Sequence, residues 1–170
     1  MRKPLTLSMM SGALVLAIGV LSMNVPDTVA DSMTFAALVI DVPDGDTLLV
    51  LRNKTRLTVK LPGIDAPELD QPYGLEAKRH AAKLVKGKVV TIDIMHPGNP
   101  VYGAVRFQKS RILAHEMVKA GMAWATTMDK SSMLAEAQET AKTARLGLWA
   151  NSEEEEPVPP WDWRAKKRFQ

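Results

Sequence analysis

Residues 56–70 read RLTVKLPGIDAPELD, and this stretch decides the fold. Hydrophobic and polar side chains alternate along residues 56–61, which is the pattern of a strand with one buried face. Three carboxylates follow within six positions, at Asp65, Glu68 and Asp70. Acidic side chains at the end of a buried strand need either solvent or a positive partner. We therefore expect a strand that ends at a charged site.

Two more strands are predicted before this one, at residues 34–42 and 47–51, both rich in β-forming residues. The turn Pro43-Asp44-Gly45 separates them, and Asn53-Lys54 leads into the strand at 56–61. Connections this short join antiparallel neighbours, so the three strands form a meander.

The rest of the pattern alternates between helices and strands. Apolar residues at helical spacing predict a helix over 74–85 and another over 112–120. A third helix begins near Ser131 or Ser132 and ends at Gly147. Two further strands are predicted at 89–94 and 105–108, with a loop over 96–103. Five short strands with one helix between the third and fourth predict a mainly β, α+β fold: a five-stranded OB-fold barrel with three helices.

The two ends of the 170-residue chain differ from this middle part. Residues 1–30 carry Arg2 and Lys3, then an apolar run, then the small-x-small sequence Thr28-Val29-Ala30, which together are typical of a signal peptide. An uncleaved membrane anchor is the alternative. We expect a folded domain over 31–150 and an acidic, then Pro/Trp-rich and basic tail over 151–170. The protein is thus expected to be exported, either periplasmic or secreted.

The acidic residues of the meander are predicted to meet. Asp46 begins the second strand and Asp65 follows the third, so both lie at one end of the sheet, with Glu68 just beyond. Three converging carboxylates would repel each other unless a cation is bound. The chain has no cysteine, and its three histidines are scattered, so oxygen ligands favour Ca²⁺ or Mg²⁺ over zinc.

Five segments in a fixed order resemble the staphylococcal-nuclease-like (thermonuclease) family. They are VPDGDTLLV (42–50), VKLPGIDAPE (59–68), QPYGLEAKRHA (71–81), MVKAGMAW (117–124) and ARLGLW (144–149). The PPWDWR sequence at 159–164 is similar to the ending of many exported bacterial members. The resemblance implies an OB-fold and a Ca²⁺-dependent enzyme that hydrolyses phosphodiester bonds of DNA and RNA.

The resemblance also assigns roles to single residues. Asp46 and Asp65 correspond to the carboxylates that bind Ca²⁺, and Ala66 would add its backbone carbonyl. Glu68 corresponds to the general base that activates the attacking water. Tyr73 and Tyr102 flank the site and are the candidates for holding the nucleotide.

This chain departs from the family pattern at two arginine positions. Lys60 replaces the first, and Ala104 replaces the second, in Tyr102-Gly103-Ala104. A lysine supplies charge without the planar fork of a guanidinium. Arg106 points to the same face of its strand as Ala104 and is the candidate replacement. The expected catalytic set is therefore Glu68, Lys60 and Arg106, with reduced activity.

Three functions remain open from the sequence. The first is an exported Ca²⁺-dependent nuclease, acting on DNA, RNA or both, preferentially single-stranded. The second is a non-catalytic nucleic-acid-binding OB-fold module. The third is an envelope assembly or interaction protein.

The tail also has two interpretations. Its aromatic and basic residues suit single-stranded nucleic acid. Alternatively, Trp161 and Trp163 clasp the barrel and leave the basic end free, which is the arrangement we expect.

Overall fold

The computed structural model describes residues 34–126, 132–152 and 156–168. The chain divides into the units Met1–Ala30 and Asp31–Gln170, and every described residue belongs to the second. The predicted signal peptide, Ser131 and the acidic residues 153–155 lie outside the described residues. Among the described residues, no helix is both long and apolar enough to cross a bilayer.

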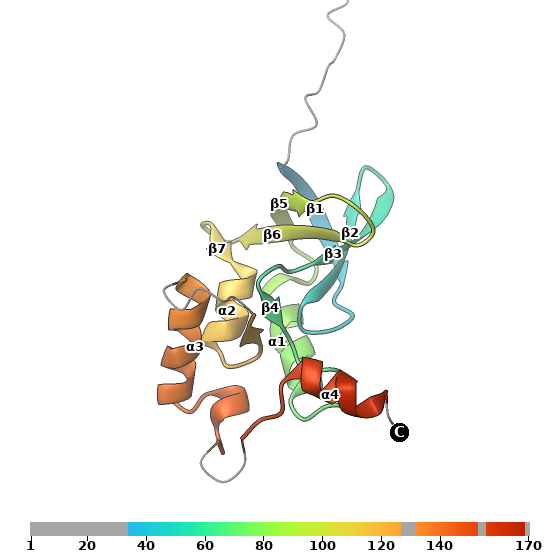
Figure 1. Ribbon diagram of the computed structural model, residues 1–170. Coiled ribbons are helices and arrows are strands. Elements are labelled where there is room, and N and C mark those ends of the chain that lie inside the picture. Colours follow the sequence, from blue (N-terminus) through green and yellow to red (C-terminus); the bar gives the residue numbers. More distant parts are fainter. Residues whose placement is uncertain (1–33, 127–131, 153–155, 169–170) are drawn as a thin grey trace, which may run out of the picture. The chain divides into compact units, whose positions relative to one another are not determined.

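Five strands form a closed barrel (Figure 1). They are β1 (Thr34–Asp41), β2 (Thr47–Arg52), β3 (Thr55–Lys60), β5 (Val89–His96) and β6 (Val101–Phe107). Neighbouring strands run antiparallel in the order β3-β2-β1-β5-β6, and a parallel pairing of β3 with β6 closes the ring. The expected OB-fold barrel is confirmed.

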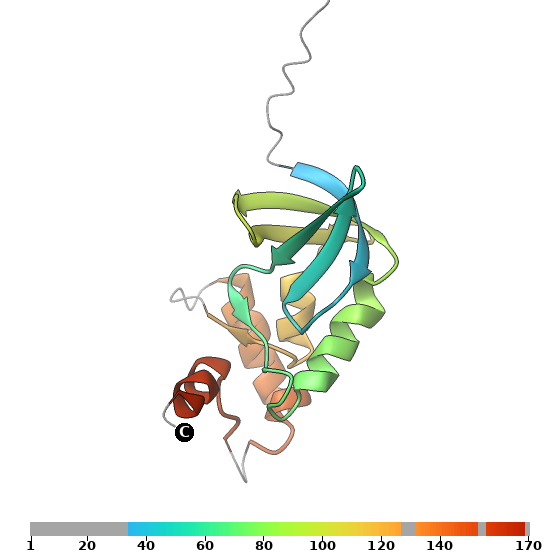
Figure 2. The ribbon, with the colours of Figure 1, turned by 90° about the vertical axis from the view of Figure 1, so that its right-hand side faces the viewer.

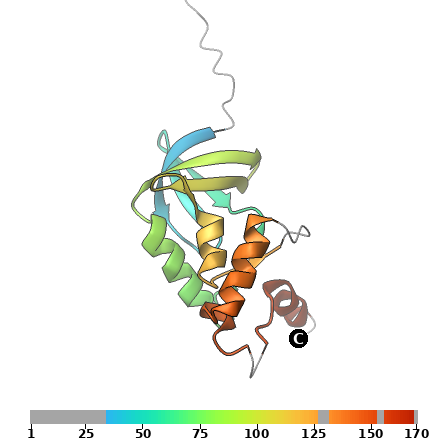
Figure 3. The same ribbon diagram turned by 90° about the vertical axis from the view of Figure 1, so that its left-hand side faces the viewer.

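Helices and short strands complete the fold. The helices are α1 (Gly74–Val85), α2 (Leu113–Lys119), α3 (Met133–Thr143), the 3-10 turn η1 (Gly147–Trp149) and α4 (Pro160–Lys167). The short strands are β4 (Ile64–Asp65), β7 (Arg111–Ile112) and β8 (Trp124–Ala125). Figure 3 shows α1, α2 and α3 side by side below the barrel. The three predicted helices are present, and Ser132 caps α3 by accepting a hydrogen bond from the amide of Ala135. Helix α3 ends at Thr143 and not at Gly147 as predicted, because Arg145 already has a left-handed φ of 52°.

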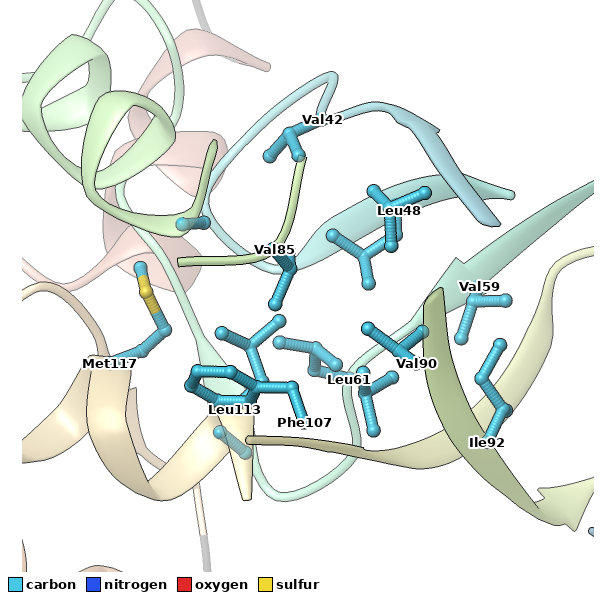
Figure 4. Close-up of a cluster of buried hydrophobic side chains, with 14 of the residues drawn as sticks. Val42, Leu48, Val59, Leu61, Val85, Val90, Ile92, Phe107, Leu113 and Met117 are labelled. Carbon is cyan, nitrogen blue, oxygen red and sulfur yellow. The ribbon is translucent and has the colours of Figure 1, made fainter. Parts of the chain in front are cut away.

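The core fills the space between the barrel and these helices (Figure 4). The strands contribute alternate residues such as Leu48, Val59 and Ile92, which are fully buried. Val85 of α1 and Met117 of α2 enter the same cluster from the helical side. Alternate side chains of the strands and the side chains at helical spacing in α1 therefore pack into one core.

The start of β6 differs from the expectation. Residues 101–103 were predicted to belong to a loop because Pro and Gly crowd the preceding residues, but they form the beginning of the strand. Val101 and Tyr102 pair with Val59 and Lys60 of β3. This pairing closes the barrel, and it depends on a partner about forty residues away rather than on local sequence.

The tail also differs from the expectation, because it contains the helix α4. Pro160 occupies the first turn of α4, where its fixed φ and missing N–H are tolerated. Figures 1 and 2 both show α4 beside the segment that connects β4 to α1.

Candidate active site

Asp46 is buried at the end of the barrel where β2 begins, with 2% of its surface exposed. Its Oδ1 accepts a hydrogen bond from Lys60 Nζ at 2.5 Å and another from the Thr47 hydroxyl at 3.2 Å. Its Oδ2 accepts from the backbone N–H of Ala66 at 3.1 Å. Asp46 is thereby tied to the segment that carries Asp65.

The approach between these two segments depends on Gly45. A Cβ atom added there would lie 2.6 Å from the Cβ of Ala66 and 2.9 Å from that of Ala77. Both distances are shorter than real side-chain contacts. The turn Asp44-Gly45-Asp46 can therefore press against the β4 segment and α1 only with a glycine at this position.

Burial and charge act in opposite directions on the Asp46–Lys60 pair. Burial raises the pKa of Asp46 to about 6, although Lys60 favours the charged carboxylate. Partial burial disfavours the charged form of Lys60, but nearby carboxylates, Asp46 first, raise the pKa of this lysine above its ordinary value. Lys60 is therefore a firmly charged ammonium group at the edge of the site.

Asp65 and Glu68 share a single guanidinium, that of Arg164 in α4. Arg164 Nη2 lies 2.7 Å from Asp65 Oδ2, and Nη1 lies 3.2 Å from Asp65 Oδ1. The same Nη1 donates to Glu68 Oε1 at 2.7 Å. These two carboxylates raise the pKa of Arg164 further above its usual value, Asp65 being the stronger partner.

The segment that carries these acids is held at both ends. At its start, Asp65 pairs with Trp124 in the two-stranded β4–β8 sheet. Further on, the backbone N–H of Glu68 donates to the side chain of Gln71 at 3.1 Å, and the N–H of Gln71 donates to the carbonyl of Glu68 at 2.9 Å. Gln71 is buried and closes this turn, which holds the backbone of Glu68 in place.

The tail makes further contacts with the same segment. Gln71 Nε2 donates to the carbonyl of Val158 at 2.5 Å. The indole N–H of Trp163 donates to Asp70 at 3.3 Å, and Lys167 forms an ion pair with Asp70. The expected clasp is thus formed by Trp163, whereas Trp161 is 41% exposed.

The expectation of a free basic end is wrong for Arg164 and Lys167, because both bind carboxylates of the domain. Among the described residues, Lys166 and Arg168 form no ion pair, as expected. Sequence reasoning missed Arg164 as a site residue. The available signal was a group of acids without a cation, combined with an arginine in a tail expected to clasp the barrel.

The other predicted site residues are Tyr102, Tyr73 and Arg106, and they differ in how close they lie to the acids. Tyr102 is the β6 partner of Lys60, so it lies at the edge of the site, and it is 41% exposed. Tyr73 is half-buried and lines a cavity together with Trp124 and Trp163. Arg106 forms an ion pair with Asp93 of the neighbouring strand, with a distance of 2.6 Å.

Because its guanidinium is engaged there, the catalytic role predicted for Arg106 requires this pair to open. Ala104, the cross-strand partner of Asp93, adds no donor.

The carboxylates of the site can provide oxygen ligands for a hard cation, but the structure brings fewer of them together than the sequence predicts. Among the residues that the structure describes, no group of three or more His, Cys, Asp or Glu side chains is arranged to hold a metal ion. Asp46 and Asp65 remain as two buried carboxylates, joined through the backbone of Ala66. Two carboxylates, one carbonyl and water molecules fit a Ca²⁺ site.

The positive partners that the sequence calls for are side chains of the chain itself. Lys60 faces Asp46, while Arg164 faces Asp65 and Glu68. These ion pairs reduce the repulsion expected between the carboxylates.

The chain is similar in sequence to several known proteins. The family model described as "Staphylococcal nuclease homologue" matches residues 58–151. An uncharacterized endonuclease of Escherichia coli is 33% identical over 132 residues, which cover 76% of this chain and 84% of that protein.

Plant proteins are also similar, but much longer. An uncharacterized 38.1 kDa protein of Capnoides sempervirens is 37% identical over 134 residues, covering 76% of this chain and 37% of that protein. The staphylococcal-like nuclease CAN1 of Arabidopsis thaliana is 36% identical over 123 residues, covering 70% of this chain and 36% of that protein. The chain thus spans little more than a third of these plant relatives.

Proposed function

The chain belongs to the staphylococcal nuclease homologue family, and from this premise we propose that it is an exported Ca²⁺-dependent nuclease that hydrolyses phosphodiester bonds of DNA or RNA. One observation carries the proposal. Asp46 is hydrogen-bonded to the residue that follows Asp65, and Glu68 shares a guanidinium with Asp65. The carboxylates needed to bind a cation and to activate water are therefore neighbours.

Each residue has a distinct role in this proposal. Asp46, Asp65 and the carbonyl of Ala66 would hold Ca²⁺, which when bound neutralises the charge of the phosphate. Glu68 is 39% exposed at its side chain, so its carboxylate can reach a water molecule and take a proton from it. Lys60 supplies a point charge beside Asp46.

The substrate is expected to lie over the exposed side of this group. Tyr102 is adjacent to Lys60 and exposed, which suits contact with a nucleotide, while Tyr73 lines the neighbouring cavity. We propose single-stranded DNA or RNA as the preferred substrate, because splayed bases can reach such aromatic side chains.

A second function is favoured by the substitutions at the arginine positions. With Lys60 and Ala104 in place, the site lacks two forked donors for the transition state, each worth about a hundredfold in rate. A non-catalytic nucleic-acid-binding module would keep the barrel and lose cleavage. Salt-sensitive binding without cleavage is the result that would support this function.

Digestion of single-stranded DNA by the full chain separates the two functions. We expect slow cleavage in millimolar Ca²⁺ and none after chelation with EGTA. Glu68→Gln should reduce the rate by about a hundredfold or more, because it removes the general base. Glu76→Gln is the matched control, since Glu76 lies on α1, where its carboxylate forms an ion pair with Arg79. Equal rates in the wild type and Glu68→Gln would overturn the proposal.

A further inference from the structure

Arg164 occupies the carboxylates at which the proposed function places a cation and a water molecule. Its two Nη atoms contact both oxygens of Asp65, and Nη1 also contacts Glu68. Among the described residues, no other guanidinium contacts either acid. The side chain reaches the site from α4, 96 residues beyond Glu68.

A metal ion and the guanidinium of Arg164 compete for the carboxylate of Asp65. The planar fork of an arginine takes one oxygen of the carboxylate with each Nη, so both oxygens are engaged. A Ca²⁺ ion on Asp65 needs a lone pair of the same carboxylate. A divalent cation beside the positive guanidinium would also be repelled over a few ångströms. Binding of one therefore disfavours binding of the other.

The attachment of α4 is suited to reversible release. Only Pro160 of this eight-residue helix is buried. A helix this short is marginal by itself, so its position depends on the contacts it makes. Those contacts are mainly polar: Arg164 on Asp65 and Glu68, with Trp163 and Lys167 on Asp70. The pairs with Asp70 and Glu68 are solvent-exposed and contribute little each, so the pair with the buried Asp65 is the main polar attachment of Arg164.

The contacts of the tail, made by α4 and the preceding Val158, also divide into two groups. Trp163, Lys167 and the carbonyl of Val158 bind Asp70 and Gln71, which are not candidate ligands. Arg164 alone binds Asp65 and Glu68. The competition can therefore be removed by one substitution that leaves the other anchors of the tail in place.

We propose that Arg164 is an internal competitor for the divalent cation, so that α4 is an autoinhibitory latch on the site. This inference rests on the proposed function and adds its regulation. With the latch closed, Asp65 and Glu68 are neutralised by the chain itself. Ca²⁺ then binds only the open fraction of molecules, and its apparent affinity is reduced by that fraction. Ca²⁺ binding displaces Arg164 and frees Glu68.

Calorimetric titration of the full chain with Ca²⁺ tests the competition. If the latch is open in about a tenth of molecules, Arg164→Gln should bind Ca²⁺ about tenfold more tightly than the wild type. Arg164→Lys, which keeps the charge and loses the fork, should fall between them. The matched control is Arg168→Gln, which removes the same charge at the C-cap of α4, where the guanidinium has no partner among the described residues. It should bind as the wild type does.

The indole N–H resonance of Trp163, assigned by its loss in Trp163→Phe, reports the latch independently of activity. In the wild type it should shift with the same Ca²⁺ midpoint as the calorimetric titration, because the Trp163–Asp70 contact borders the displaced arginine. Equal Ca²⁺ affinities in the wild type and Arg164→Gln would overturn the latch and leave the nuclease proposal intact. Absence of Ca²⁺ binding in both would overturn both proposals.

A third result would also overturn the latch. If Arg164→Gln cleaves DNA at least tenfold more slowly than the wild type at saturating Ca²⁺, Arg164 contributes to catalysis instead of blocking it. The latch predicts that Arg164→Gln is faster at low Ca²⁺ and no slower at saturation.

Discussion

Lys60 compensates the charge of the buried Asp46 carboxylate. The carboxylate is 2% exposed, and an isolated buried charge would be strongly unfavourable. Lys60 Nζ lies 2.5 Å from it, and the amide of Ala66 satisfies the other oxygen. A lysine at this position therefore has a structural role in the metal-free protein, whatever it contributes to catalysis.

Replacing Lys60 should reveal that role. We expect Lys60→Met to lower the free energy of unfolding in EGTA by about 2 kcal/mol, a value below that for a fully buried pair because the Lys60 side chain is 32% exposed. Asp46→Asn in the same chain should recover most of the loss, since no unpaired charge then remains. Urea denaturation measures both. An unchanged stability in Lys60→Met would mean that Asp46 does not need the ion pair.

The acidic residues of the site and Lys60 could be predicted from the sequence, whereas Arg164 could not. Asp46 and Asp65 follow from the meander, because adjacent antiparallel strands place the start of one beside the end of the next. Arg164 pairs with Asp65 across 99 residues and with no periodic pattern to indicate it. Arg164 reaches Asp65 only because the tail forms α4 and packs beside the acids.

At the scale of elements, the turn between β4 and α1 positions the backbone of Glu68. Tyr73 precedes α1 with φ of 67°, in the left-handed region. Gly74 then passes so close to Glu68 that an added Cβ would lie 1.9 Å from the carbonyl oxygen of Glu68. The helix start and the proposed base are thus packed backbone against backbone.

Gly74→Ala should therefore disturb both the turn and the chemistry. We expect a loss of about 3 kcal/mol in stability, as for severe overpacking, together with reduced cleavage by the folded fraction. Gly87→Ala is the comparison, because Gly87 has φ of 75° but no atom within 4 Å of the added Cβ. Its cost should be about 1 kcal/mol, from backbone strain alone, with unchanged cleavage. Thermal melts and initial rates distinguish them, and equal effects of the two substitutions would contradict this role of Gly74.

Elements with a regular period could be predicted, and elements defined by tertiary contacts could not. The α1 range follows from apolar residues at helical spacing and is confirmed at Gly74–Val85. The two-residue strands β4 and β8 carry no periodic signal, because each exists only through pairing with the other. Helix α4 was missed because its composition is polar, and it is stabilised by contacts with Asp65, Glu68 and Asp70.

At the scale of the whole molecule, export stays a prediction from residues 1–30, which lie outside the described residues. The positive residues, apolar run and small-x-small sequence predict cleavage after Ala30. The intact mass of protein recovered from outside the cytoplasm should therefore correspond to a chain that begins at Asp31. A mass that retains residues 1–30 would contradict cleavage and favour the membrane-anchor alternative.

The proposed nuclease mechanism gives two separate roles to the acids: Asp46 binds the cation, and Glu68 activates water. The most direct test measures initial rates of single-stranded DNA cleavage across a range of Ca²⁺ concentrations. Asp46→Asn should move the half-maximal Ca²⁺ concentration upward by about tenfold or more, because it removes a charged ligand. Glu68→Gln should lower the plateau by about a hundredfold at an unchanged midpoint. Cleavage that does not depend on Ca²⁺, or a plateau unaffected by Glu68→Gln, would contradict the account.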